Sequence, residues 1–342
     1  MFIDTPLSRL AAFVLAFAGM LANGQVTAES VADFYRGKTV HTYVGFGPGG
    51  NNDTWARTLA RHLPKHLPGE PVMVVQNMPG AGSLKLTNFL YNAAPKDGTA
   101  FGIVSRGIPL DPLFGGKQTQ FDPLKFGWIG SPTQNTTVCV ARKDAAVQNM
   151  EDLLTKQLTV GASGSGADTN TYPTILNNLL GMKFKVITGY KGSKDIYLAI
   201  ERNEVEGVCI AFSSLARRAI YKDGLVKVLF QAANEGDPKL KGIPLVIDLV
   251  KSDADKQALN LFFARAVMGR PFLAPPDVPQ ERIKALQEAF DKTMKDPAFL
   301  ADAKKVKLRV DPVSGEQLSQ TLAKAYQTPA EIVTRVSKAI GR

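Results

Sequence analysis

The chain alternates short apolar segments with longer helical patterns along most of its length, and this alternation limits the folds it can adopt. Several strand candidates are continuous apolar runs, as expected for strands covered on both faces. They lie at 39–45, 72–76, 100–104, 137–141, 158–161, 185–188, 207–211 and 226–231. The helical patterns lie at 54–67, 83–92, 171–180, 193–202, 214–221, 279–295, 297–305, 314–325 and 329–340. The alternation predicts an α/β fold with mostly parallel sheets and helices on both faces.

The N-terminus has the features of a secretory signal peptide. Arg9 precedes an apolar run of about 12 residues, which is too short to cross a bilayer about 30 Å thick. Val26-Thr27-Ala28 then fits a small-x-small cleavage site. We therefore predict that residues 1–28 are a signal peptide removed on export and that the mature chain is periplasmic. An amphipathic or buried N-terminal helix is the alternative.

Composition and charge narrow the classes of partner. The 342 residues are 44% hydrophobic, which suits one large domain or two medium ones, and the formal net charge is +10. Such an excess can attract anions, acidic membranes or nucleic acid. Export argues against nucleic acid, and no run of Lys and Arg is interleaved with aromatic residues. For most of these residues we expect no role beyond solubility.

Two segments look like crossings between lobes. The stretch "FGWIGSPTQNTTVCVAR" at 126–142 is read as extended, and so is the proline-rich "NLFFARAVMGRPFLAPPDVPQ" at 260–280. If both cross, the first lobe is built from residues 29–131 plus 263–342. The second lobe is then 132–262, and the two crossing strands form a hinge.

A glycine-rich loop follows the first strand candidate. Gly45, Gly47 and Gly50 have the G-x-G-x-x-G spacing of a dinucleotide site. Such a site also needs an acidic residue at the end of the second strand, and here that strand ends in Gln76-Asn77. The loop still leads into a helix start, where unpaired N–H groups bind anions. An ordinary capped turn is the alternative.

Similar loops recur after other strands, in both predicted lobes. They are "NMPGAGS" at 77–83, "GASGSGADTNTY" at 161–172 and "TGYKGSKD" at 188–195. Ligands of open α/β sheets bind beyond the carboxyl ends of the strands. Two lobes that present these loops to each other would enclose a small anion.

The order and spacing of several motifs resemble the exported substrate-binding proteins of the tripartite tricarboxylate transporter group, the Bug family. The motifs are Gly49-Gly50-Asn51-Asn52-Asp53, "NMPGAG" at 77–82, "APKDGTAFGI" at 94–103, "SGSG" at 163–166, "GYKGS" at 189–193 and the C-terminal "LAPPDVPQERIKALQEAFDKTMKDPAF". The family's P-x-V-P-T-x-x-E segment is largely absent around 234–249. Asp168-Thr169-Asn170 stands where a histidine is usual. Ligand preference is therefore not carried over.

The resemblance implies a two-lobed type II periplasmic binding protein, the Venus flytrap fold. Such a protein captures a small carboxylate and delivers it to membrane transporter subunits. It implies no enzyme activity, no cofactor, no metal and no nucleic-acid partner, and we expect a monomer. A sensor subunit that presents its ligand to a receptor remains open. An exported hydrolase is a further alternative, although the chain has no G-x-S-x-G elbow.

The predicted ligand site combines loop residues from both lobes. We expect the amides of residues 51–54 to donate to a carboxylate, and Asp53 to cap its helix rather than face an anion. Arg106 is either a bidentate partner of the ligand or a surface arginine, and Lys191 either supplies charge or is solvated. The full predicted set is Phe46, Gly47, Asn51, Asn52, Asp53, Thr54, Gly80, Ala81, Ser105, Arg106, Ser163, Ser165, Gly166, Ala167, Asp168, Tyr190, Lys191, Gly192, Phe212 and Ser213.

The cysteines and histidines suggest no metal centre. Cys139 and Cys209 lie in strand candidates, and they would pair if those strands were neighbours. We favour two buried free thiols. His62 and His66 have i, i+4 spacing, but Pro64 interrupts it and no Glu follows His62. We expect both histidines at the exposed end of a helix.

Overall fold

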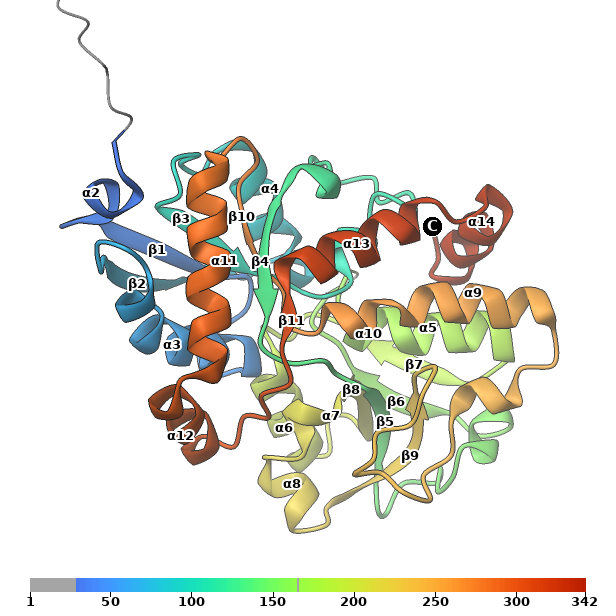
Figure 1. The fold of residues 1–342 in the computed structure, drawn as a ribbon. Helices are drawn as coiled ribbons and strands as arrows, with labels where there is room; N and C mark the ends of the chain where they lie inside the picture. The colour runs from blue at the N-terminus through green and yellow to red at the C-terminus, as the bar shows by residue number, and fades with distance from the viewer. Residues whose placement is uncertain (1–28, 165) are drawn as a thin grey trace, which may run out of the picture.

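A computed structural model describes residues 29–164 and 166–342 of the chain. The predicted signal peptide at 1–28 and the predicted site residue Ser165 lie outside the described residues. Figure 1 shows two β-sheets, each in its own half of the molecule, with helices packed around them. No helix within the described ranges is long and apolar enough to span a membrane.

The first sheet has the strand order β11-β4-β10-β3-β1-β2. Its strands are β1 (Thr39–Val44), β2 (Val72–Asn77), β3 (Ala100–Ile103), β4 (Gly127–Ser131), β10 (Phe272–Ala274) and β11 (Val313–Ser314). Strand β1 pairs in parallel with β2 and β3, whereas β10 and β11 pair antiparallel with β4. The carboxyl ends of β1, β2 and β3 therefore meet at one edge of the sheet.

The second sheet has the order β7-β6-β8-β5-β9. Its strands are β5 (Thr137–Arg142), β6 (Leu158–Gly161), β7 (Phe184–Ile187), β8 (Gly207–Ala211) and β9 (Val226–Ala232). Strands β6, β7 and β8 run parallel, and β5 pairs antiparallel with both β8 and β9. Both sheets are therefore mixed rather than mostly parallel, because the strands that enter from the other lobe run against the parallel core.

The helices agree closely with the predicted patterns in most places. They are α2 (Val31–Tyr35), α3 (Asn51–His62), α4 (Leu84–Asn92), α5 (Asp168–Leu180), α6 (Ser193–Glu201), α7 (Phe212–Leu215), α8 (Ala219–Lys222), α9 (Asp253–Phe263), α10 (Arg265–Met268), α11 (Gln280–Lys295), α12 (Pro297–Lys305), α13 (Gly315–Tyr326) and α14 (Ala330–Ala339). The single helix predicted at 214–221 is divided into α7 and α8. The C-terminal helix α14 packs against α9 and α5 (Figure 1).

Two segments of the described chain pass between the two sheets. One leads from β4 through Thr133 to β5, and the other leads through Gly269 to β10. The segment before β11 lies beside the first crossing and forms a bridge with it through Thr133 and Asp311. Residues 260–268, predicted to be extended, are instead the end of α9 and all of α10, because Ser252 caps α9 and its apolar residues Leu259, Phe262 and Phe263 face the core. The lobe boundaries given above stay a prediction.

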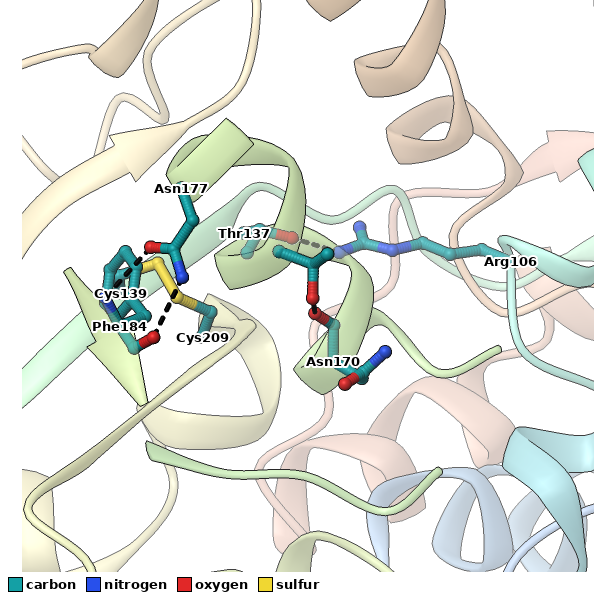
Figure 2. Close-up of a disulfide and its surroundings, with 8 residues drawn as sticks. Arg106, Thr137, Cys139, Asn170, Asn177, Phe184 and Cys209 are labelled. Atoms are coloured by element: carbon teal, nitrogen blue, oxygen red, sulfur yellow. Dashed lines mark hydrogen bonds between the residues drawn. A yellow bond between two sulfur atoms is a disulfide. The ribbon is translucent and has the colours of Figure 1, made fainter. Parts of the chain in front are cut away.

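Cys139 and Cys209 form a disulfide, so the expectation of free thiols was wrong (Figure 2). The two residues lie directly opposite each other in the antiparallel pair of β5 and β8, with their Cα atoms 4.0 Å apart. Such close pairs in antiparallel sheets bring the two side chains together. The sequence did not show that β5, which enters from the other lobe, inserts next to β8.

Candidate functional site

A cavity lies between the two sheets, at the carboxyl ends of their parallel strands. Its walls come from the loop after β1, the loop after β3, the start of α5, the start of α6, the end of β8 and the segment before β10. The lining residues are Phe46, Gly47, Gly50, Asn51, Asn52, Ser105, Arg106, Ser163, Ala167, Asp168, Thr169, Gly192, Ser193, Ile210, Ala211, Ser214 and Arg270. Both sheets contribute to it, as expected for a site at which two lobes close on a ligand.

The first wall is the N-terminus of α3. Gly50 is the residue before this helix and has an extended backbone, so the helix begins at Asn51, three residues earlier than predicted. Helix N-terminal amides have no acceptor within the helix and favour a negative charge. The N–H of Thr54, however, donates to the carbonyl of Gly50 at 3.0 Å. The amides that remain for an anion are therefore those of the first three residues of α3.

Asn51 is the strongest indication of a ligand at this wall. Its side chain lines the cavity and is only 3% exposed. Neither its amide nitrogen nor its amide oxygen has a hydrogen-bond partner within the described residues. Buried polar groups in native proteins are nearly always paired, so these two atoms identify a place where a polar ligand or water belongs.

Asp53 holds this wall in position and does not line the cavity. Its carboxylate accepts hydrogen bonds from the amide of Gly49 at 2.8 Å, from Nε of Arg57 at 3.0 Å and from Nδ2 of Asn77 at 2.8 Å. Asn77 also donates to the carbonyl of Phe46 at 2.9 Å. Burial acts to raise the pKa of Asp53, but the bonds from Arg57, Gly49 and Asn77 outweigh it and lower the pKa below its usual value. The hydrogen bonds of Asp53 and Asn77 therefore connect the glycine loop after β1 to the glycine loop after β2.

Arg106, after β3, is neither a surface residue nor free to bind a ligand through its whole guanidinium group. It is buried, and it donates to the carboxylate of Asp168, the carbonyl of Asn135 and the hydroxyl of Thr137. Figure 2 shows its side chain reaching to Thr137 at the start of β5. Asp168 also pairs with Nη1 of Arg265 at 3.3 Å. Burial acts to raise the pKa of Asp168, but attraction by Arg106 and Arg265 outweighs it and lowers the pKa.

Arg270 lines the cavity and was not predicted as a site residue. It follows Gly269, whose positive φ of 56° lets the chain pack closely against the carbonyl of Thr133 in the neighbouring crossing segment. The backbone amide of Arg270 donates to Oγ of Ser131 at 2.7 Å, and its Nη1 donates to Oδ1 of Asn52 at 2.9 Å. Burial, followed by repulsion from Arg106, lowers the pKa of Arg270 to about 9.

The rim of the cavity is closed by backbone rather than by side chains. A Cβ atom placed on Gly82 would lie 2.7 Å from the backbone nitrogen of Ala167, in the facing loop of the second sheet. A Cβ atom on Gly164 would likewise lie 3.0 Å from the backbone nitrogen of Gly82. The predicted loops 77–83 and 161–172 are therefore in direct contact across the two sheets.

The predicted site residues divide into three groups. Those that line the cavity are Phe46, Gly47, Asn51, Asn52, Ser105, Arg106, Ser163, Ala167, Asp168 and Gly192. Those that lie outside its lining are Asp53, Thr54, Gly80, Ala81, Gly166, Tyr190, Lys191, Phe212 and Ser213, and Ser165 is not described. The lining residues that sequence reasoning missed are Gly50, Thr169, Ser193, Ile210, Ala211, Ser214 and Arg270. Extending the predicted site by one or two residues at the start of α6 and around the end of β8 would have included four of them. Nothing in the local sequence indicated Arg270.

No group of three or more His, Cys, Asp or Glu side chains in the described ranges is arranged to hold a metal ion. His62 and His66 instead contact different carboxylates, those of Asp302 at 3.0 Å and Asp296 at 3.2 Å. Both histidine side chains are partly buried against α12 rather than exposed. The two histidines therefore connect α3 and the turn that follows it to the C-terminal helices.

Comparison with known proteins places the chain in a family. A family model described as the tripartite tricarboxylate transporter family receptor matches residues 55–341. A UPF0065 protein of Bordetella pertussis is 26% identical over 302 residues, which cover 86% of this chain and 85% of the relative. The region that the family model matches includes the second sheet, all strands of the first sheet except β1, and every wall of the cavity except Phe46 to Asn52.

Two solved structures share the fold. The periplasmic binding protein BugD superposes with a TM-score of 0.72 at 21% identity, over 89% of this chain and 98% of the other. MatC from Rhodopseudomonas palustris, solved with bound malate, superposes with a TM-score of 0.70 at 18% identity, over 89% and 99%. The two-lobed fold predicted from the motifs is thereby confirmed. The chain belongs to the tripartite tricarboxylate transporter receptor family, whose members are binding proteins rather than enzymes, and it has the two-lobed fold of periplasmic binding proteins.

Proposed function

We propose that this protein is exported to the periplasm, captures a small carboxylate between its two lobes and delivers it to the membrane subunits of a tripartite tricarboxylate-type transporter. The lobes are residues 29–131 plus 263–342 and residues 132–262. The ligand site is formed by the predicted residues that line the cavity and by the seven further lining residues, and among them Arg106 and Asp168 hold the walls in place rather than contact the ligand. The carboxylate class agrees with the malate bound by MatC.

One observation carries this proposal above the others. Asn51 buries two unpartnered polar atoms beside the first amides of α3, at the wall of a cavity shared by both sheets. One carboxylate oxygen can accept from Nδ2 of Asn51 and from the helix amides, and water or a ligand hydroxyl can donate to its Oδ1. No side chain at this wall needs to change protonation for such binding, so the site is suited to capture rather than to catalysis.

Capture requires the two walls to separate and close again. The two crossing segments, one before β5 and one before β10, are the places where the chain can bend, because in the described chain they carry the backbone from one sheet to the other. A ligand that contacts α3 on one side and α5 or α6 on the other favours the closed form by its difference in affinity for the two forms. The closed face is then the surface that a transporter distinguishes from the open one.

A thermal-shift screen of the mature chain against mono- and dicarboxylates tests the proposal. A bound acid raises the melting temperature by mass action, and isothermal titration then gives its Kd. Asn51→Ala should weaken the best acid about tenfold, as expected for the loss of a hydrogen bond to a charged group. Asn92→Ala, an exposed amide on α4, is the control. If no carboxylate stabilises the wild type, the proposed function is wrong.

A further inference from the structure

The next inference deepens the proposed function and rests on it. We propose that Arg270 determines specificity by requiring a second anionic group on the ligand. The ligand is then a small dianionic acid, with one carboxylate at the first turn of α3 and a second oxyanion paired with the Arg270 guanidinium group. A monocarboxylate of the same length lacks the group that this arginine needs.

The hydrogen bonds of Arg270 leave most of its donors free. Nη1 donates to Oδ1 of Asn52 at 2.9 Å, which is a neutral acceptor. Its Nε is buried and has no partner within the described residues. Arg270 also forms no ion pair with any aspartate or glutamate of that part of the chain. An arginine that is partly buried and has no ion-pair partner is costly unless an anion binds to it.

Arg106 shows, in the same cavity, what a purely structural arginine looks like. Its donors are taken by the carboxylate of Asp168, the carbonyl of Asn135 and the hydroxyl of Thr137. Asp168 is in turn shared between Arg106 and Arg265. Asp168 attracts Arg270 through space, but it forms its ion pairs with the other two arginines and none with Arg270. The contrast indicates that the free edge of Arg270 serves a partner from outside the chain.

The wider charge balance around the cavity supports a dianion. On the other side of α3, Nη2 of Arg217 donates to Oγ1 of Thr54 at 3.1 Å, and Nη2 of Arg218 donates to the carbonyl of Gly49 at 3.3 Å. Both acceptors are neutral, and the Nε atoms of both arginines are buried and unpartnered. The guanidinium groups near α3 thus outnumber the carboxylates that face them. A ligand with a single charge would leave this excess only partly neutralised.

Comparing a diacid with the monoacid of the same chain length measures the contribution of the second anionic group to binding. Isothermal titration would compare succinate with butyrate, glutarate with pentanoate, and adipate with hexanoate. The wild type should bind the diacid of the best-fitting length about 10- to 100-fold more tightly than its monoacid, as expected for one additional charge-assisted pair. Diacids that carry a sulfonate or phosphate in place of the second carboxylate show which oxyanion is preferred.

Arg270→Gln should remove this preference. Its affinity for the diacid should fall about 10- to 100-fold, while its affinity for the monoacid stays within about threefold. Arg202→Gln, an exposed arginine on the far end of α6, should change neither. Arg270→Lys should recover only part of the diacid affinity, because an ammonium group cannot form a fork of two parallel bonds.

Asn52→Asp provides a test that does not depend on the folding of an arginine variant. The new carboxylate would lie at the acceptor that Arg270 already contacts, and it would neutralise the arginine within the protein. We expect a higher melting temperature without ligand and a diacid preference reduced at least tenfold. A preference unchanged in both Arg270→Gln and Asn52→Asp would overturn the role of Arg270 but leave the proposed function intact. If the wild type binds no acid of either kind, the proposed function itself fails.

Discussion

At the scale of single residues, two aspartates lie in or beside the site, and neither is free to repel an anion. Asp53 is held by Gly49, Arg57 and Asn77, and Asp168 is held by two arginines. Each carboxylate therefore acts on the ligand indirectly, by fixing a wall of the cavity. In the proposed binding mode, the positive charge that the ligand meets comes from the helix amides and from Arg270.

Asp53→Asn should lower stability in a pH-dependent way. The pKa of Asp53 in the folded protein is lower than in the unfolded chain. The carboxylate therefore stabilises the fold fully above its unfolded pKa of about 3.9, and this stabilisation is lost as the pH falls through the folded pKa. At pH 7 the variant should lose about 2 kcal/mol of unfolding free energy, as expected for charged hydrogen bonds.

Urea unfolding at pH 7 and at pH 3 measures this difference. The gap between wild type and Asp53→Asn should narrow at the lower pH. An equal gap at both values would show that the carboxylate charge is not responsible. Asp97→Asn is a suitable comparison, because that carboxylate accepts only from its neighbour Thr99 within the described chain.

Residue-level prediction from sequence is most direct where the residue's role is local. Asn51 and Asp53 belong to one strand-to-helix junction, which the glycine loop marks in the sequence, although the helix begins three residues earlier than predicted. Arg270 depends on Asn52, which lies 218 positions away in the sequence, and on a glycine turn in a crossing segment. No local pattern encodes such a contact, and this is why the arginine was missed.

At the scale of elements, the strands were predicted most reliably. In β3, β5 and β8 the apolar run buries both faces of the strand, so the run itself marks the element. Strand β2 is an exception, because its apolar residues are only partly buried or exposed. The prediction for residues 260–268 was wrong because the extended conformation expected near the prolines, which begin at Pro271, was assigned to the preceding residues as well. Those residues form the end of α9 and all of α10. The disulfide was missed because the order of strands within the second sheet, which places β5 next to β8, is not a property of either strand's own sequence.

The disulfide between β5 and β8 closes a loop with a sequence separation of 70 residues. Cross-linking a loop of that length stabilises a protein by about 4 kcal/mol in the chain-entropy model. Reduction, or the double variant Cys139→Ala and Cys209→Ala, should therefore lower the unfolding free energy by roughly this amount. Urea unfolding with and without dithiothreitol measures it. The double variant should no longer respond to reductant, and a response of the same size would contradict the assignment.

At the scale of the whole molecule, Asp168 and its two arginines join three separate parts of the chain. Arg106 follows β3 of the first sheet, Asp168 begins α5 of the second, and Arg265 begins α10 near the crossings. The group therefore connects the two sheets directly through side-chain ion pairs. Its Arg106 partners Asn135 and Thr137 lie on the crossing that leads into β5.

Asp168→Asn should loosen this arrangement. Removing one partner of a buried ion pair costs about 3 to 5 kcal/mol, because the other charges stay buried without compensation. We expect a lower melting temperature and, without ligand, a larger radius of gyration by small-angle X-ray scattering. A saturating acid should restore part of the compact form. An unchanged radius together with an unchanged melting temperature would show that the lobes are held by other contacts.

The contact of Gly82 with the backbone of Ala167 has a consequence for how cargo leaves the protein. A rim formed by side chains can open by rotation of those side chains while the backbone stays in place. A rim formed by contact of backbone with backbone cannot open in this way. Release of the ligand then requires the half of the molecule that holds one sheet to move away from the half that holds the other. The rate of this separation sets the residence time of the ligand. A docked membrane partner that separates the two halves would therefore control that residence time.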